Sequence, residues 1–155
     1  MSTYLTSKKI IKEWTDYNDH MNLSYYILVF DVGAEVFLSK FKMGEVSAKT
    51  TKKSTMVVET HTVYQNEVKE EDEVDIFLSY FDHDNKRLQY KLEMYDKVKN
   101  VLSATTEVLS LYIDLNKRKV AEFENEKIKI MNEFIKVNKN NFDAKDLKFS
   151  AKLKK

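Results

Sequence analysis

The pattern of apolar residues changes along the chain and predicts one long helix. From Leu23 to Phe41, apolar residues recur at steps of three, one and four, which is the spacing of one face of an α-helix. Asn22 is a suitable N-cap, and the helix is expected to end near Lys42-Met43 with Gly44 as its C-cap. Roughly twenty residues at a rise of 1.5 Å each make a helix of about 30 Å. We expect a helix so long and so apolar to be wrapped by a sheet.

Strand-like segments lie on both sides of this helix. Residues 4–14 are predicted as a first strand, and residues 45–53 as a polar linker after the helix. Four further strands are expected, at residues 55–64, 74–81, 88–94 and 101–113. The short turns between the last three predict an antiparallel meander. The expected fold class is therefore α+β, with an antiparallel sheet curled around the central helix.

The C-terminal part of the chain is predicted to form an additional helix and a solvated tail. From residue 125 onward, apolar residues recur at helical spacing on two faces: Ile128, Met131 and Ile135 share one, and Ile130, Phe134 and Val137 share the other. Residues 136–155 then hold seven Lys and two Asp, so this segment carries about five positive charges. We place the domain at residues 1–137 and a Lys-rich tail at 138–155. The tail is expected to be frayed, and a docking arm for an anionic partner is the alternative.

Composition excludes several kinds of chemistry. The chain has no Cys, which removes disulfides, thiolate metal sites and Cys nucleophiles, and its three His lack helical metal-ligand spacing. Two Gly cannot supply a Gly-rich phosphate loop or a dinucleotide fingerprint. With 26 Lys and Arg against 25 Asp and Glu, no nucleic-acid partner is expected. Without a membrane-length apolar run or a leader pattern, the chain is expected to be cytoplasmic and not membrane-bound.

Residues with chemical potential gather in the loop before the long helix. Residues 13–22 read EWTDYNDHMN and are dense in turn and capping residues. A helix start offers unpaired N–H groups and the positive end of the helix dipole, and both stabilise a developing oxyanion. Asp16 lies just ahead of this start, in a field that favours its ionised form. Taken alone, Asp16 is better explained as a turn or capping residue.

This loop resembles the signature loop of the hotdog-fold thioesterases. In the 4-hydroxybenzoyl-CoA thioesterase group an Asp lies between the first strand and the central helix, and several members continue with Asn, Gly, His, an apolar residue and Asn. On that pattern fall Asp16, Asn18, His20, Met21 and Asn22. With Val58-Glu59-Thr60-His61 as a second match, the chain is most similar to thioesterases associated with carnitine and betaine catabolism. The agreement in element order extends over residues 4–115.

The resemblance implies a hotdog fold and hydrolysis of an acyl-CoA to the free acid and CoA. Asp16 would attack the thioester or activate a water, and the sequence leaves both routes open. Backbone donors from about Asp19 to Leu23 would bind the oxyanion. Asn18, His20 and Glu59 are the other catalytic candidates, with Glu59 positioning the water or pairing with His20. CoA would enter as part of the substrate, with no separate cofactor and no metal.

One departure from the family pattern concerns the acyl group. The substrate-binding candidates are Trp14, Tyr17, Asp19, Met21, Tyr25 and His61. The family usually has Gly in place of Asp19, because Gly permits a positive φ and close backbone approach. A second carboxylate there would suit a cationic trimethylammonium acyl group, held by Asp19 and by the rings of Trp14, Tyr17, Tyr25 and Tyr26. Lys86 and Arg87 are candidate ligands of the CoA phosphates, as are Lys52 and Lys53.

Several functions stay open. The leading prediction is an acyl-CoA thioesterase for a short-chain, betainyl-like substrate, acting as a homodimer or dimer of dimers because an exposed sheet edge favours pairing with a second copy. The alternative is a non-catalytic acyl-CoA-binding hotdog protein in which Asp19 has blocked turnover. A hotdog dehydratase is disfavoured, since its His motif contains Pro and this chain has none. A purely structural module is the remaining alternative.

Overall fold

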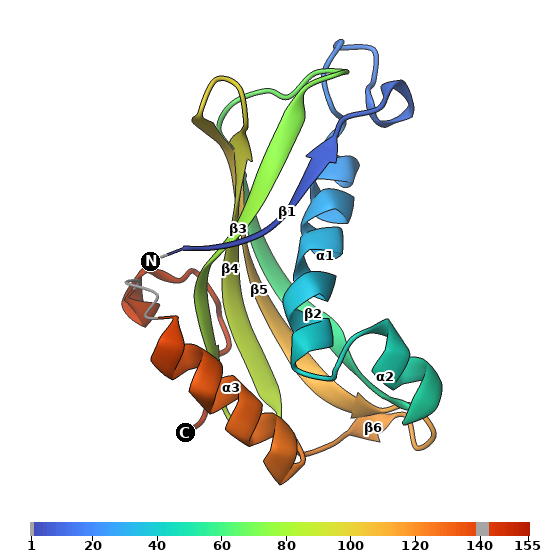
Figure 1. Cartoon of the computed structure of the whole chain (residues 1–155), viewed down its shortest axis with the longest axis vertical. Helices are drawn as coiled ribbons and strands as arrows, with labels where there is room; N and C mark the ends of the chain where they lie inside the picture. Colours follow the sequence, from blue (N-terminus) through green and yellow to red (C-terminus); the bar gives the residue numbers. More distant parts are fainter. Residues whose placement is uncertain (1, 139–142) are drawn as a thin grey trace.

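An antiparallel sheet curls around one long helix (Figure 1). The structure is a computed structural model that describes residues 2–138 and 143–155. Within these residues the strands are β1 (Thr3–Lys9), β2 (Lys53–Tyr64), β3 (Glu73–His83), β4 (Arg87–Asp96), β5 (Val101–Asp114) and the short β6 (Lys119–Val120). Their order is β1-β3-β4-β5-β2, with β6 paired to β5. The predicted α+β class and curled sheet are confirmed.

The first strand is shorter than predicted. β1 ends at Lys9, and residues 12–14 form a single 3-10 turn, η1 (Lys12–Trp14). Ile10, the next residue, has a fully buried side chain, and its N–H donates to the Asp72 carbonyl at 2.8 Å. The chain then turns away from the sheet toward the helix start.

The central helix, α1 (Leu23–Lys40), lies in the concave face of the sheet. Its buried residues are Tyr26, Val29, Phe30, Gly33, Ala34, Phe37 and Leu38. Gly33 brings the helix backbone close to β3, because a Cβ there would lie 2.7 Å from a methyl group of Ile76. Among the described residues, no helix is long and apolar enough to cross a membrane.

The predicted C-cap at Gly44 is wrong. α1 ends at Lys40 with Phe41 as its C-cap, and Lys42 rather than Gly44 takes the left-handed conformation, at φ 61°. Gly44 instead precedes a short helix, α2 (Glu45–Thr50), in the segment predicted as a linker. Its lack of a Cβ leaves room for the Glu35 carboxylate, which accepts a hydrogen bond from the Glu45 N–H at 2.8 Å.

The predicted second helix is present as α3 (Asn125–Val137), and it closes one end of the core. The ring of Phe134 lies 5.2 Å from that of Phe41 and 5.8 Å from that of Phe81, measured between ring centroids. α3 therefore joins the end of α1 to β3, far from the loop that enters α1 (Figure 1).

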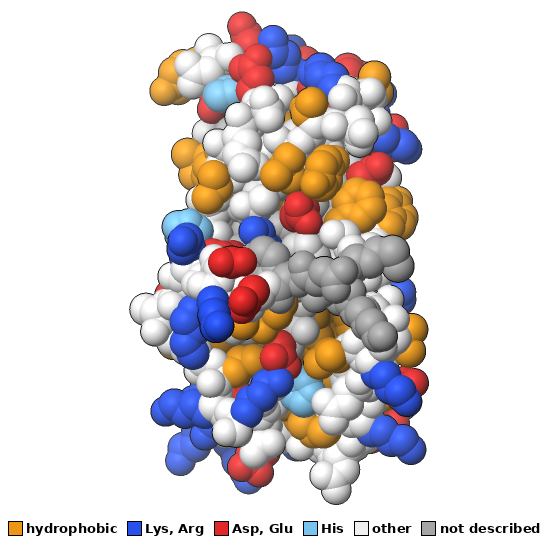
Figure 2. Space-filling view, turned by 90° about the vertical axis from the view of Figure 1, so that its left-hand side faces the viewer, with side chains coloured by type: hydrophobic (Ala, Val, Ile, Leu, Met, Phe, Trp, Pro, Cys, Tyr) orange, Lys and Arg blue, Asp and Glu red, His pale blue; other side chains and the backbone are white. Residues whose placement is uncertain are grey.

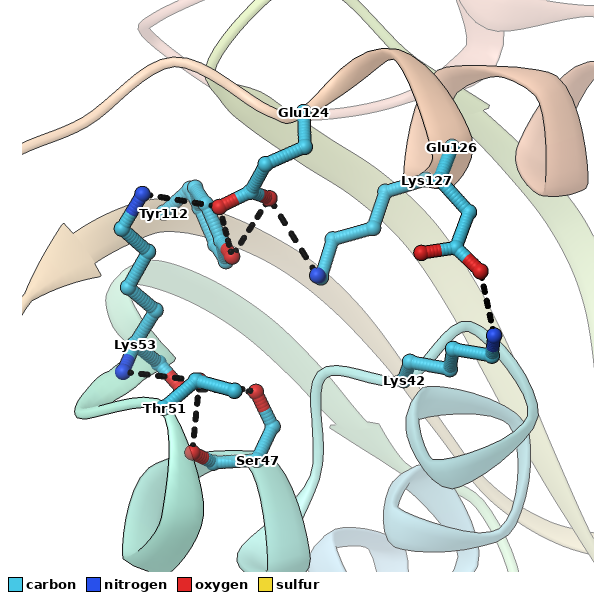
Figure 3. Close-up of polar contacts among 8 residues, drawn as sticks. All are labelled: Lys42, Ser47, Thr51, Lys53, Tyr112, Glu124, Glu126 and Lys127. Atoms are coloured by element: carbon cyan, nitrogen blue, oxygen red, sulfur yellow. Dashed lines mark hydrogen bonds and ion pairs between the residues drawn. The ribbon is translucent and has the colours of Figure 1, made fainter.

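Charged contacts anchor the start of α3 (Figure 3). The Glu124 carboxylate accepts hydrogen bonds from Lys53 Nζ at 2.8 Å and from the Tyr112 hydroxyl at 2.9 Å, and lies 3.2 Å from Lys127 Nζ. Partial burial alone raises the pKa of Glu124, but the hydrogen bonds from Lys53, Tyr112 and Lys127 lower it to about 2. Lys53 is therefore committed to Glu124 and is not a free phosphate ligand.

The prediction of a frayed tail is wrong for residues 143–155. Leu147 and Phe149 are buried against Tyr80 and Leu109 on the outer face of the sheet. Acidic side chains of the sheet and of the β3–β4 turn accept N–H groups of this segment: Glu107 from Lys148 at 3.0 Å, Glu59 from Ser150 at 2.7 Å, and Asp84, in the turn, from Lys154 at 2.8 Å. Acidic and basic side chains are interspersed over this side of the molecule (Figure 2). Residues 139–142 of the predicted tail lie outside the described residues.

Candidate active site

The loop before α1 folds back so that Asp16 faces the helix start. An isolated bridge joins Thr15 to Met21. The Asp16 N–H donates to the His20 carbonyl at 3.1 Å, and the Asn22 N–H donates to the Trp14 carbonyl at 2.8 Å. These bonds close the loop and fix the position of the Asp16 side chain relative to α1.

Two donors hold the Asp16 carboxylate, which is 19% exposed. Its Oδ1 accepts the Asn18 N–H at 2.9 Å, and its Oδ2 accepts Nδ2 of Asn22 at 3.0 Å. The hydrogen bond from Asn18, followed by that from Asn22, lowers the pKa of Asp16 below its usual value. The carboxylate is therefore ionised at neutral pH and is available as a nucleophile or a base.

Asn22 connects this carboxylate to the helix. Its Oδ1 accepts the Ser24 N–H at 3.0 Å as an N-cap, while its Nδ2 donates to Asp16. The sequence predicted the cap but not the second bond. The sequence did contain a signal for this second bond. Among the favoured N-cap residues, only Asn has a side-chain N–H group that stays free to donate once its side-chain oxygen has capped the helix.

The backbone donors near the helix start are only partly free. The N–H groups of Asp19, Met21 and Asn22 donate to carbonyls of Asp16, Val68 and Trp14. Within residues 2–138 and 143–155, the N–H groups of His20 and Leu23 have no acceptor. The predicted oxyanion donors from Asp19 to Leu23 therefore reduce to these two.

Asp19 has the backbone conformation that the family pattern predicts for its usual Gly. Its φ is 58°, in the left-handed region that Asp tolerates better than most residues. Its side chain is exposed. The carboxylate therefore has access to solvent, and a folded loop survives the replacement of Gly.

A cavity of about 360 Å³ opens beside Asp16. It is lined by Asp16, Tyr17, Asn18, His20, Met21, Asn22, Leu23, Tyr26, Tyr64, Gln65, Asn66 and Glu67. His20 lies between two carboxylates, with Nε2 3.9 Å from Asp16 and Nδ1 3.7 Å from Glu67. Tyr64, the last residue of β2, and Glu67, in the segment after it, were missed because they lie far from the loop in sequence and outside any motif.

The predicted aromatic wall is only partly present at this cavity. Trp14 stacks on Tyr25, with ring centroids 5.9 Å apart and an angle of 18° between the rings, and neither residue lines the cavity. Both pack against the core instead. Tyr17 lines the cavity but is 94% exposed, whereas Met21, also in the lining, is 1% exposed.

The prediction that Glu59 pairs with His20 is wrong. A register shift between Val57 and Glu59 changes which β2 residues face α1. Thr60 and Tyr64 lie on the side of the helix, so Glu59 and His61 point to the outer face. There the Glu59 carboxylate accepts N–H groups of Ser150 and Ala151, at 2.7 and 3.3 Å. The chain does not bring Glu59 or His61 to Asp16.

The predicted phosphate ligands also lie away from the loop. Arg87 Nη1 donates to Asp84 Oδ2 at 2.9 Å, and the Arg87 side chain is 18% exposed. Lys86 and Arg87 follow the far end of β3, whose eleven residues span roughly 35 Å at about 3.3 Å each. Arg87 therefore holds a turn together and is not free to bind a phosphate near Asp16.

Comparisons with known proteins agree with this geometry. Residues 11–137 match the family model described as the thioesterase-like superfamily. The chain is 28% identical over 126 residues to a betainyl-CoA thioesterase of Pseudomonas aeruginosa, covering 81% of this chain and 78% of the relative. A Staphylococcus aureus protein solved in complex with CoA has a TM-score of 0.81 at 20% identity, covering 98% of each chain. A DHNA-CoA thioesterase of the same organism has a TM-score of 0.80 at 14% identity, covering 92% of this chain and 96% of the other.

The curled sheet and buried central helix are the hotdog fold of these thioesterases, as the loop resemblance implied. Fold and family together define a thioester hydrolase. The chain belongs to the thioesterase-like superfamily.

Proposed function

We propose that this chain hydrolyses a short-chain, betainyl-like acyl-CoA to the free acid and CoA, with Asp16 as the reacting carboxylate. The observation that carries the proposal is that the Asp16 carboxylate and two residues with free backbone N–H groups, His20 and Leu23, line the same cavity. Asp16 faces a cavity of about 360 Å³ that also contacts Leu23. The betainyl-CoA relative supports the acyl group, and CoA is part of the substrate, so no cofactor is required.

In this proposal the thioester oxygen binds the N–H groups of Leu23 and His20. Asp16 either attacks the carbonyl carbon, releasing CoA thiolate and leaving an acyl anhydride that water hydrolyses, or removes a proton from an attacking water. The two N–H groups stabilise the negative charge that develops on the oxygen in both routes. His20, between the carboxylates of Asp16 and Glu67, is placed to donate a proton to the leaving thiolate.

The proposal includes a second copy of the chain. Within the described residues β2 is an edge strand, and Met56, Val57 and Val58 are 38%, 51% and 53% exposed on it. An uncovered apolar edge of this length favours antiparallel pairing with the β2 of a second copy.

A panel of acyl-CoA substrates with a thiol-release readout tests the proposal. Asp16→Asn keeps the shape of the side chain but removes its charge, and it is expected to lower kcat/KM by at least ~100-fold. Glu70→Gln, a charge-matched change at an exposed position, serves as the control. Full activity in Asp16→Asn would contradict the proposed role. Tight binding of acyl-CoA without CoA release in the unmodified protein would favour the non-catalytic alternative.

A further inference from the structure

A groove of about 680 Å³ follows the end of β3, far from the Asp16 loop (Figure 1). One wall consists of six consecutive residues, 80–85, which are the end of β3 and the start of the turn after it. α3 forms a second wall, in which Ile128 and Ile135 lie two helical turns apart on one face. Lys154 and Lys155 of the C-terminal segment complete the lining. We call this the β3 groove.

The part of β3 that lines this groove is an edge of the sheet. β4 pairs with β3 as far as His83 on one side. On the other side, β1 pairs with β3 only as far as Leu78, whose partner is Thr3. Among residues 2–138 and 143–155, no strand takes the place of β1 beside Phe81 and His83.

The turn after β3 shows which main-chain groups point to this edge. The Asp84 N–H donates to the Arg87 carbonyl at 3.1 Å, so these two residues form a hydrogen-bonded pair of the β3–β4 ladder. Bonded and non-bonded pairs alternate in an antiparallel ladder, and therefore the N–H and C=O groups of His83 and Phe81 point away from β4. The His83 N–H agrees with this, because it donates to the Asp82 carboxylate at 2.8 Å.

Three of the main-chain groups at this edge have no partner. Across the described parts of the chain, nothing outside the sheet bonds to the N–H or C=O of Phe81 or to the C=O of His83. Phe81 and His83 are only 4% and 8% exposed, so water has little access to them. A buried main-chain group without a partner costs about as much free energy as a lost hydrogen bond. A strand added at this edge would supply all three partners.

The two walls of the β3 groove decide which strand fits. Side chains of a strand alternate between the two faces of its sheet. On the face that α3 covers, an added strand would meet the half-buried Ile128 and Ile135. On the outer face it would meet Lys154 and Lys155. Lys155 pairs with Asp82 at 2.6 Å, whereas in residues 2–138 and 143–155 no carboxylate pairs with the ammonium of Lys154.

We propose that the β3 groove binds an extended segment of a partner protein in which apolar and acidic residues alternate. The segment pairs with the main chain of Phe81 and His83, its apolar side chains pack against α3, and its acidic side chains face Lys154. The β3 groove shares no lining residue with the Asp16 cavity, so this inference is independent of the proposed hydrolysis. Since α3 and the C-terminal segment flank the edge, a single strand fits it better than the sheet of a second copy.

A dye-labelled peptide, acetyl-Val-Glu-Val-Glu-Val-amide, tests the charge and the location by fluorescence anisotropy. We expect it to bind at least about tenfold more tightly than the peptide in which Lys replaces both Glu. Lys154→Glu should weaken binding of the acidic peptide about tenfold. The control Lys148→Glu makes the same charge change in the same segment, at an exposed residue outside the groove, and should leave binding unchanged.

Two N-methylated forms of the acidic peptide test the main-chain pairing without altering the protein. All Glu amides of a strand point to one side and all Val amides to the other, so methyl groups on the two Glu amides or on the two central and C-terminal Val amides block opposite edges. One form, and only one, should lose binding. In the protein, amide hydrogen exchange of Phe81 should slow about tenfold with saturating peptide, whereas that of Asp82, which points to β4, should not change.

Four outcomes overturn the inference: no binding at ~1 mM acidic peptide, equal binding of the basic peptide, equal affinity of the two methylated forms, or an equal loss of binding in Lys154→Glu and Lys148→Glu. Unchanged exchange at Phe81 in the presence of bound peptide would place the peptide elsewhere and also contradict the proposal. Circular dichroism of both variants establishes that they are folded.

Discussion

Replacing Phe149 with Ala tests whether the C-terminal segment is part of the folded protein. Phe149 is 5% exposed and packs with Tyr80, Leu109 and Leu147 in a small cluster on the outer face of the sheet. Burying a Phe side chain contributes about 1.5–3 kcal/mol. A surface segment relaxes around a deletion, so the cavity cost of an interior site is largely avoided. We therefore expect Phe149→Ala to lower the free energy of unfolding by about 2 kcal/mol.

Equilibrium unfolding in urea measures this change. The matched control is Lys145→Ala in the same segment, an exposed position whose substitution should stay within about 0.5 kcal/mol. If Phe149→Ala and Lys145→Ala have equally small effects, the segment is not docked in solution and the reasoning from burial fails.

Two further predictions concern the site. Asn22→Ser keeps an N-cap but removes the Nδ2 donor to Asp16, so the pKa of Asp16 should rise. The acid limb of the pH profile of kcat/KM should therefore move to higher pH, and a limb that does not move would show that this hydrogen bond does not lower the pKa of Asp16. Val57→Lys places a charge on the β2 edge and should convert a dimer to monomers with loss of activity. The control Val98→Lys, at a turn residue that is 87% exposed, should leave the dimer intact. If light scattering finds both variants in the same oligomeric state, the proposed pairing of β2 edges is contradicted.

Hydrophobic periodicity predicted which helices and strands form more accurately than it predicted where each one begins and ends. The helical face from Leu23 and the alternation of β3 and β4 were both readable, because burial on one face imposes a period on the sequence. The C-cap was misplaced because Gly44 is required by a contact with Glu35, nine residues earlier, and not by its own φ. Tertiary contacts of this kind leave no periodic signal.

Site residues that belong to one contiguous motif were predicted correctly. Those whose position depends on strand pairing or on contacts with the C-terminal segment were not. The Asp16 loop, including the positive φ of Asp19, followed from a contiguous pattern. Glu59 was assigned to the site from a four-residue match, but a bulge between Val57 and Glu59 reverses the alternation of β2 at this point, and the sequence pattern does not reveal the bulge.

The tail was misjudged for a different reason. Its Lys content dominated the prediction, although Leu147 and Phe149 lie two residues apart, as in a segment with one buried face. The acidic residues that receive its N–H groups, Glu59, Asp84 and Glu107, are distributed over three separate parts of the sequence. Only the folded sheet gathers them under the tail.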